Sequence, residues 1–218
     1  AAIAVSLLMT LLSRCLALFP ASVVGLSLLC MAAMIWCPDW LGRGLAGGGL
    51  LTVLYLYPVA AYRLLLHFKP LGSPLREELT GDRYSHWWGS HQLQVIYLTL
   101  PVLERILRVI PGCYSAWLRL WGARIGQQVY WTPNVEIHDR GLLALGHGVI
   151  LGHEAKLVAH VVMPHRQQLR LYAKTIEVGD GAFIGAGSVL GPGVQVDAGV
   201  QLPVRTEGRI NQHFTASS

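Results

Sequence analysis

Aliphatic residues recur at every sixth position near the C-terminal end of the chain. The stretch is VGDGAFIGAGSVLGPGVQVDAGVQL, residues 178–202, and the recurring residues are Val178, Ile184, Leu190, Val196 and Leu202. This period is neither the 3.6 of an α-helix nor the 2 of a simple strand. It is typical of a chain that winds in triangular coils, in which each six-residue unit forms one side and one aliphatic residue points inward. Stacked coils of this kind pair as parallel strands and bury a column of Val, Ile and Leu.

The same period begins earlier and is interrupted once. Inward positions are predicted at Ile125, Trp131 and Ile137 and, after a slip of two residues, at Leu145, Leu151, Leu157 and Met163. Glycine follows several of them, as expected at tight corners where a side chain would clash. The phase is lost over residues 164–177, which predicts a loop leaving one coil, and function tends to concentrate in such excursions. We therefore predict a parallel β-helix of about four coils over residues 124–204 and an irregular tail at 205–218.

Two apolar stretches near the N-terminus predict membrane spans. Residues 21–37 carry no basic or acidic residue, residues 45–66 carry only Arg63, and each stretch is long enough to cross a bilayer. Residues 1–19 form a third pass or an interfacial helix, and without a basic start or a cleavage site we expect no cleaved signal peptide. Basic residues are more frequent after the second stretch than between the two, which predicts an integral membrane anchor at 1–69 with the C-terminal domain in the cytoplasm.

Residues 70–123 connect the anchor to the repeats. Residues 71–88 are polar and rich in turn residues, and residues 92–110 show the apolar spacing of an amphipathic helix, which Pro101 should kink. A short helix is predicted at 114–121. We expect these helices to lie on the membrane surface, to cap the open end of the coil, or to do both.

Composition agrees with a membrane-associated protein. Hydrophobic residues make up 53% of the chain and charged residues 13%, and the mean hydropathy is +0.44. An ordinary soluble domain has about a quarter of its residues charged. The net charge of +5 favours anionic membrane lipids as partners over nucleic acid, for which the chain has no motif. The four cysteines lack the spacing of a metal site or a disulfide framework, so we expect free thiols.

Histidines near the excursion are the candidate catalytic residues. His160 is the last regular position before the phase is lost, and a neutral imidazole there could accept a proton from an attacking hydroxyl or amine. His138, with Asp139 next to it, is a second candidate, and this pair could orient a second imidazole or contact a substrate. His147 and His153 occupy equivalent outward positions of consecutive units, where a solvated surface residue is the usual outcome.

The segment KLVAH, the excursion and then LYAKTIEVGDGAFIGAGSVLGPGVQV resemble the hexapeptide-repeat acyltransferases, and the repeats match that family over residues 125–203. The resemblance implies a left-handed parallel β-helix in which His160 is the general base and an acyl group moves from a thioester to a hydroxyl or amine. It implies acyl-CoA or an acyl carrier thioester as co-substrate, no bound cofactor or metal, and a homotrimer or pseudo-trimer with sites between neighbouring helices. Phe183 stands where the family's repeat usually has Trp. The backbone groups implied to line the groove for the pantetheine arm are those of Gly185, Ala186, Gly187 and Ser188.

Three alternatives remain open. The passage YSAWLRLWGARIG, which follows the apolar stretches, is similar to the membrane-linked C-terminal domains of poly-lysine-synthetase-type peptide synthetases, which implies amide formation from an aminoacyl carrier thioester. A zinc-dependent hydratase of the γ-carbonic-anhydrase type would need three converging imidazoles. The third alternative is a non-catalytic scaffold. The histidines available to a zinc site would be His160 and His165, with His138, His147 or His153 as the third ligand.

Overall fold

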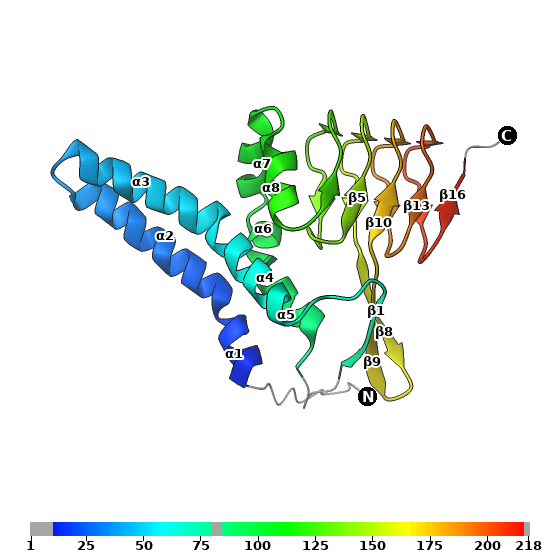
Figure 1. Cartoon of the computed structure of the whole chain (residues 1–218), viewed down its shortest axis with the longest axis horizontal. Helices are drawn as coiled ribbons and strands as arrows, with labels where there is room; N and C mark the ends of the chain where they lie inside the picture. Colours follow the sequence, from blue (N-terminus) through cyan, green and yellow to red (C-terminus); the bar gives the residue numbers. More distant parts are fainter. Residues whose placement is uncertain (1–10, 80–83, 216–218) are drawn as a thin grey trace. The chain divides into compact units, whose positions relative to one another are not determined.

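The computed structural model describes residues 11–79 and 84–215 of the chain (Figure 1). The chain divides into two compact units, one of residues 1–70 with 81–103 and one of residues 71–80 with 104–218. The first unit contains the helices α1 (Leu11–Ala17), α2 (Phe19–Trp36), α3 (Trp40–Tyr55), α4 (Tyr57–Phe68), α5 (His86–Gln92) and α6 (Val95–Thr99). Helix α7 (Val102–Val109) begins at the boundary, and the second unit adds α8 (Cys113–Leu120) and the strands.

Helices α2 and α3 form a hairpin in the first unit (Figure 1). The Asp39 carboxylate starts α3 by accepting a hydrogen bond from the Gly42 backbone N–H at 2.6 Å. By length and composition α2 is able to cross a membrane, in agreement with the stretch predicted at 21–37. The stretch predicted at 45–66 is not one straight helix, because α3 and α4 meet at a bend of 42°.

Pro58 explains the bend between α3 and α4. Proline has no backbone N–H, so the carbonyl four residues earlier, that of Leu54, loses its helical donor. The hydroxyl of Tyr97, from α6, donates a hydrogen bond to this carbonyl at 2.6 Å, and Tyr97 is buried. Helix α6 therefore stabilises the bend by supplying the donor that proline removes.

Replacing Tyr97 with phenylalanine is expected to destabilise the helical unit by about 1–3 kcal/mol, because a part-buried carbonyl is left without its donor. The matched control is Tyr55→Phe. The Tyr55 hydroxyl donates to the Leu103 carbonyl at 3.0 Å, but that carbonyl lies in the first turn of α7, where the helix supplies a donor of its own. Thermal unfolding of the detergent-purified chain measures both variants, and equal losses would contradict the role given to Tyr97.

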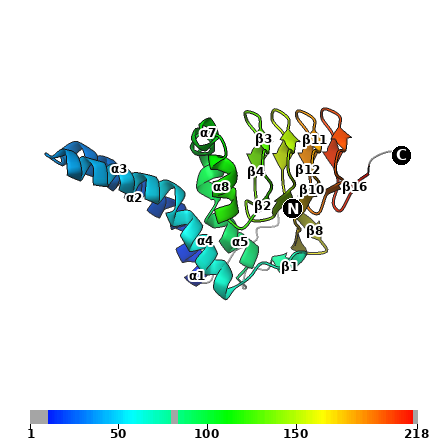
Figure 2. The same ribbon diagram turned by 45° about the horizontal axis from the view of Figure 1, so that its top comes forward.

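The second unit is built from stacked coils, and the strands of successive coils pair to form three parallel sheets, one for each side of the coil (Figure 2). The structure therefore confirms the predicted parallel β-helix, with four complete coils in the part of the chain that it describes. The first sheet contains β2 (Arg124–Ile125), β5 (Leu143–Leu145), β10 (Ile176–Val178), β13 (Gln195–Val196) and β16 (His213–Phe214). The second sheet contains β3 (Tyr130–Trp131), β6 (Ile150–Leu151), β11 (Phe183–Ile184) and β14 (Gln201–Leu202). The third sheet contains β4 (Glu136–Ile137), β7 (Lys156–Leu157), β12 (Val189–Leu190) and β15 (Glu207–Gly208).

The aliphatic column predicted from the sequence fills the interior of the β-helix. Leu151, Ile184 and Leu190 are almost inaccessible to solvent, and Trp131 is partly exposed in the first coil. The glycine after an inward residue is required by close stacking of the coils. A Cβ on Gly152 would lie 2.5 Å from the backbone nitrogen of Ala186 in the next coil.

Two boundaries differ from the prediction. The β-helix does not end at residue 204, because β15 pairs with β12 and β16 pairs with β13. The irregular tail predicted at 205–218 is therefore wrong up to Phe214. The terminal coil is rich in outward polar residues, and Gly208 takes an inward position below Leu190, so the aliphatic signal is absent there.

The excursion is a β-hairpin and begins earlier than predicted. Strands β8 (His160–His165) and β9 (Gln168–Ala173) pair antiparallel, and β1 (Leu75–Leu79) adds a third strand beside β9. The loop predicted at 164–177 is corrected accordingly. Met163, predicted to point inward, lies on β8 and is 37% exposed.

Candidate active site

His160 lies at the point where the hairpin leaves the second coil. It is the first residue of β8, directly after the buried Ala159. The carbonyl of Ala159 accepts a hydrogen bond from the Lys174 backbone N–H at 2.9 Å, which closes the base of the hairpin. The backbone before His160 is therefore held at the coil, the backbone after it pairs with β9 (Gln168–Ala173) in the hairpin, and the His160 side chain is 15% exposed.

Asp139 contacts His160 from the neighbouring coil. It lies in the turn between β4 and β5, which is closed by a hydrogen bond from the Leu142 backbone N–H to the Asp139 carbonyl at 3.0 Å. One carboxylate oxygen of Asp139, Oδ2, is 2.6 Å from Nδ1 of His160. A carboxylate that accepts the Nδ1 proton makes Nε2 the basic nitrogen of the ring, which is the arrangement of a general base with its orienting acid.

The sequence predicts that His138 with Asp139 orients a second imidazole or contacts a substrate, but it does not pair Asp139 with His160. Asp139 and His160 are 21 residues apart in the chain, and their contact depends on the pairing of β4 with β7. That pairing sets Ile137 beside Leu157, so the residues that follow the two strands share one corner. Aligning the sequences of consecutive coils, and comparing their acidic residues as well as their aliphatic ones, would identify the pairing of Asp139 with His160.

His138, the second predicted catalytic residue, shares the corner with His160. The two ring centroids are 6.1 Å apart, and Nε2 of His138 is 3.9 Å from the Glu136 carboxylate. Burial lowers the pKa of His138 below its ordinary value and outweighs the opposite effect of Asp139. A neutral imidazole next to the His160–Asp139 pair could hydrogen-bond a substrate atom without adding positive charge.

The lowered pKa of His138 predicts how stability depends on pH. The unfolded chain takes up a proton at His138 more readily than the folded chain, so this contribution to stability is complete above about pH 6.5 and is lost as the pH falls below it. In His138→Gln we expect a smaller loss of thermal stability between about pH 7 and pH 5 than in the wild type. Parallel stability curves for the two proteins would contradict this.

The four residues predicted to bind the pantetheine arm lie at a different corner of the β-helix. Gly185, Ala186, Gly187 and Ser188 connect β11 to β12, whereas His138, Asp139 and His160 follow strands of the third sheet. The Ser188 side chain is buried, donates to the Pro203 carbonyl at 3.2 Å and accepts from the Thr206 backbone N–H at 3.1 Å. Its hydroxyl therefore joins two coils. One β-helix does not bring these four residues to His160, since the third sheet lies between the two corners.

The histidines considered for a zinc site do not converge. His147 accepts a hydrogen bond from the Gln127 backbone N–H at 3.1 Å, and His153 pairs with Glu154 at 3.3 Å. His165 is at the far end of β8 from His160. Within residues 11–79 and 84–215, no three His, Cys, Asp or Glu side chains are grouped so as to hold a metal ion.

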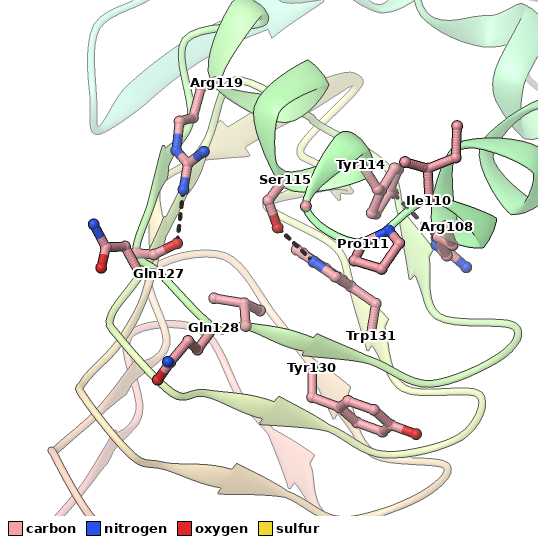
Figure 3. A pocket seen from close by; sticks show the side chains of 13 residues that line it. Arg108, Ile110, Pro111, Tyr114, Ser115, Arg119, Gln127, Gln128, Tyr130 and Trp131 are labelled. Carbon is pink, nitrogen blue, oxygen red and sulfur yellow. Dashed lines mark hydrogen bonds between the residues drawn. The ribbon is translucent and has the colours of Figure 1, made fainter.

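A cavity of about 540 Å³ lies beside α8 and the first coil (Figure 3). Arg108, Tyr114, Trp131 and other residues line it, and the indole of Trp131 donates to the Ser115 hydroxyl at 2.8 Å. The lining residues include no Asp, Glu or His. The cavity therefore offers no general base, in contrast to the corner with His160.

Comparison with known proteins gives similarity to solved structures only. No family model and no curated protein matches the chain. A hexapeptide-repeat-containing acetyltransferase from Vibrio cholerae is 13% identical with a TM-score of 0.30, over 50% of this chain and 85% of that one. A maltose O-acetyltransferase from Clostridium difficile 630 is 14% identical with a TM-score of 0.29, over 52% and 77%.

A serine acetyltransferase isoform from Entamoeba histolytica, solved in complex with cysteine, is 12% identical with a TM-score of 0.24, over 93% of this chain and 80% of that one. At identities of 12–14% and TM-scores of 0.30 or below, the comparison assigns neither an activity nor a substrate to this chain. The fold rests on the sheets of the structure itself.

Proposed function

We propose that this chain is an acyltransferase that moves an acyl group from a thioester to a hydroxyl or amine. The observation that carries the proposal is the 2.6 Å contact between Nδ1 of His160 and the Asp139 carboxylate, at the base of a hairpin that leaves the β-helix. The contact orients a partly exposed imidazole, which a scaffold would not need. Acyl transfer requires such a base to deprotonate the acceptor.

The reaction follows from the roles of the two residues. Nε2 of His160 removes the proton of the acceptor oxygen or nitrogen as that atom attacks the thioester carbonyl. A backbone N–H stabilises the negative charge on the carbonyl oxygen in the tetrahedral intermediate. The carbon–sulfur bond then breaks, the thiolate leaves, and His160 returns the proton to it. Asp139 is a positioning residue, since it acts through His160, and His138 would hold the acceptor.

The active unit in this proposal is a homotrimer. A site that uses both His160 and the segment 185–188 needs two chains, because one chain places them at different corners. The outer face of the second sheet supports association, since Tyr130, Ile150 and Phe183 are paired in register and all are exposed. Contiguous exposed apolar side chains commonly mark an interface. A monomer in detergent with full activity would contradict this part of the proposal.

The acceptor in this proposal is membrane-associated, such as a lipid-linked sugar or a growing polymer. The length and apolar composition of α2 support a membrane anchor. With the catalytic domain on the cytoplasmic side, both acyl-CoA and an acylated carrier protein are available as donors. Equal turnover of a water-soluble acceptor would count against the membrane acceptor.

Thiol release by the detergent-purified chain tests the proposed function. Acetyl-CoA, longer acyl-CoAs and an aminoacyl carrier protein are offered to the wild type and to His160→Ala, and zinc is measured on the same samples. Release that is lost in the variant supports the acyltransferase. Release from the carrier alone assigns the peptide-synthetase-type reaction. Stoichiometric zinc without thiol release would replace the proposal by the hydratase.

A further inference from the structure

A buried charged pair lies directly behind the turn that carries Asp139. Arg140, the next residue, has a side chain that is only 1% exposed, and Glu104 of α7 is 6% exposed. Nε of Arg140 donates to Oε1 of Glu104 at 2.7 Å, and a terminal guanidinium nitrogen lies 2.6 Å from the same oxygen. The guanidinium also lies over the Trp117 ring, 5.9 Å from its centroid.

The second carboxylate oxygen of Glu104 is held as well. It accepts hydrogen bonds from the Tyr114 hydroxyl at 2.9 Å and from Arg108 at 3.3 Å. Burial, and then the charge of Glu104, raise the pKa of Tyr114 well above its ordinary value, so its hydroxyl stays protonated and remains a donor. Figure 3 shows Arg108 beside Tyr114.

The same network holds the chain on both sides of β4. Arg108 donates to the Val135 carbonyl at 2.8 Å, immediately before the strand, and Glu104 holds Arg140 in the turn after it. Helix α7 is thereby fixed to the segment 135–140 at two points. Asp139 is the residue directly before Arg140, so the Glu104–Arg140 pair restrains the chain next to it.

A buried ion pair of this kind is a costly way to stabilise a fold, because well-packed apolar residues of similar volume often serve as well or better. The pair instead fixes the distance and orientation of the turn that carries Arg140 relative to α7. We propose that Glu104 is a positioning residue that, through Arg140, keeps the Asp139 carboxylate on Nδ1 of His160. The inference concerns the same site as the proposed acyl transfer and rests on that function for its kinetic consequence only.

The test uses the full chain, labelled with 15N at histidine, in detergent. An imidazole Nδ1–H donated to a carboxylate gives a downfield proton resonance, which is assigned to His160 by its loss in His160→Ala. In Glu104→Gln we expect this resonance to disappear and kcat for thiol release to fall about 100-fold, as when a reacting group is misplaced by about 1 Å. The KM for the thioester should not change, because the pair does not contact the donor in the proposed reaction.

Two further variants make the result decisive. Glu104→Leu with Arg140→Met removes the two charges of the buried pair together, and Arg108 keeps its hydrogen bonds to the Val135 carbonyl and the Tyr114 hydroxyl. The double variant should therefore fold, yet it should still lose the resonance and the rate. Arg119→Met is the matched control. Arg119 joins α8 to the coil through the carbonyls of Ile125 and Gly126 and does not touch the turn, so the resonance should persist.

The outcomes distinguish this inference from the proposed function. A folded double variant that keeps the resonance and the wild-type kcat would overturn the positioning role and leave the pair as a structural element. Absence of the resonance from the wild type would overturn it too, since the contact of Asp139 with His160 would then not exist. If no thioester is turned over, the acyl transfer is wrong, while loss or retention of the resonance still decides the role of Glu104.

Discussion

Replacement of His160 by alanine is expected to lower kcat for thioester-dependent acyl transfer by about 10²–10⁴-fold, the contribution of a positioned general base. The fold should survive the change. The His160 side chain lies at the edge of the coil, and its place in the hairpin is set by backbone pairing with Ala173. Initial rates of thiol release, with the acceptor saturating, measure the effect.

His165→Ala is the matched control for this experiment. It removes the same side chain from the same strand, at the far end of β8 where His165 pairs with Gln168, and should leave the rate unchanged. Asp139→Asn should also lower the rate strongly, because an amide at the same place no longer favours the Nδ1–H tautomer of His160. If His160→Ala retains most of the activity, another group is the base and the proposed mechanism is wrong.

The repeats were predictable because their period is a property of the fold. One side of a triangular coil takes six residues, so a column such as Leu151, Ile184 and Leu202 can be identified without knowledge of its neighbours. The strand β1 carries no comparable signal. It has the sequence LREEL and pairs with β9, which lies about 90 residues away in the chain, so nothing local distinguishes it from a polar turn.

The site was predictable in part for the same reason. His160 can be singled out because it lies close to the point in the chain where the six-residue period is lost, which is a one-dimensional property. Asp139 and Glu104 act through contacts across coils and between a helix and a turn. To predict those contacts, one must know where the two extra residues between Ile137 and Leu145 lie in space. The six-residue period does not give that position.

Replacing Gly152 with alanine is expected to destabilise the β-helix by about 3 kcal/mol or more, because the added methyl group is forced against backbone. A Cβ at this position would lie 2.5 Å from the Ala186 nitrogen and 2.7 Å from the Ile184 carbonyl oxygen. The Gly152 backbone N–H donates to that same carbonyl at 2.7 Å, so separating the coils to make room also weakens their pairing. Thermal unfolding followed by the β-sheet circular dichroism signal should show a melting temperature lower by roughly 6–12 °C.

The control is Gly181→Ala, which isolates the other reason for glycine in this fold. Gly181 has a φ of +66° but open space around the position of a Cβ, so alanine there meets only the conformational cost of the left-handed region, about 1 kcal/mol. A larger loss at Gly152 than at Gly181 means that the contact distance between coils, more than the shape of the corners, requires glycine. The opposite order would mean that the corners limit the fold, and the glycine after each inward residue would then be replaceable.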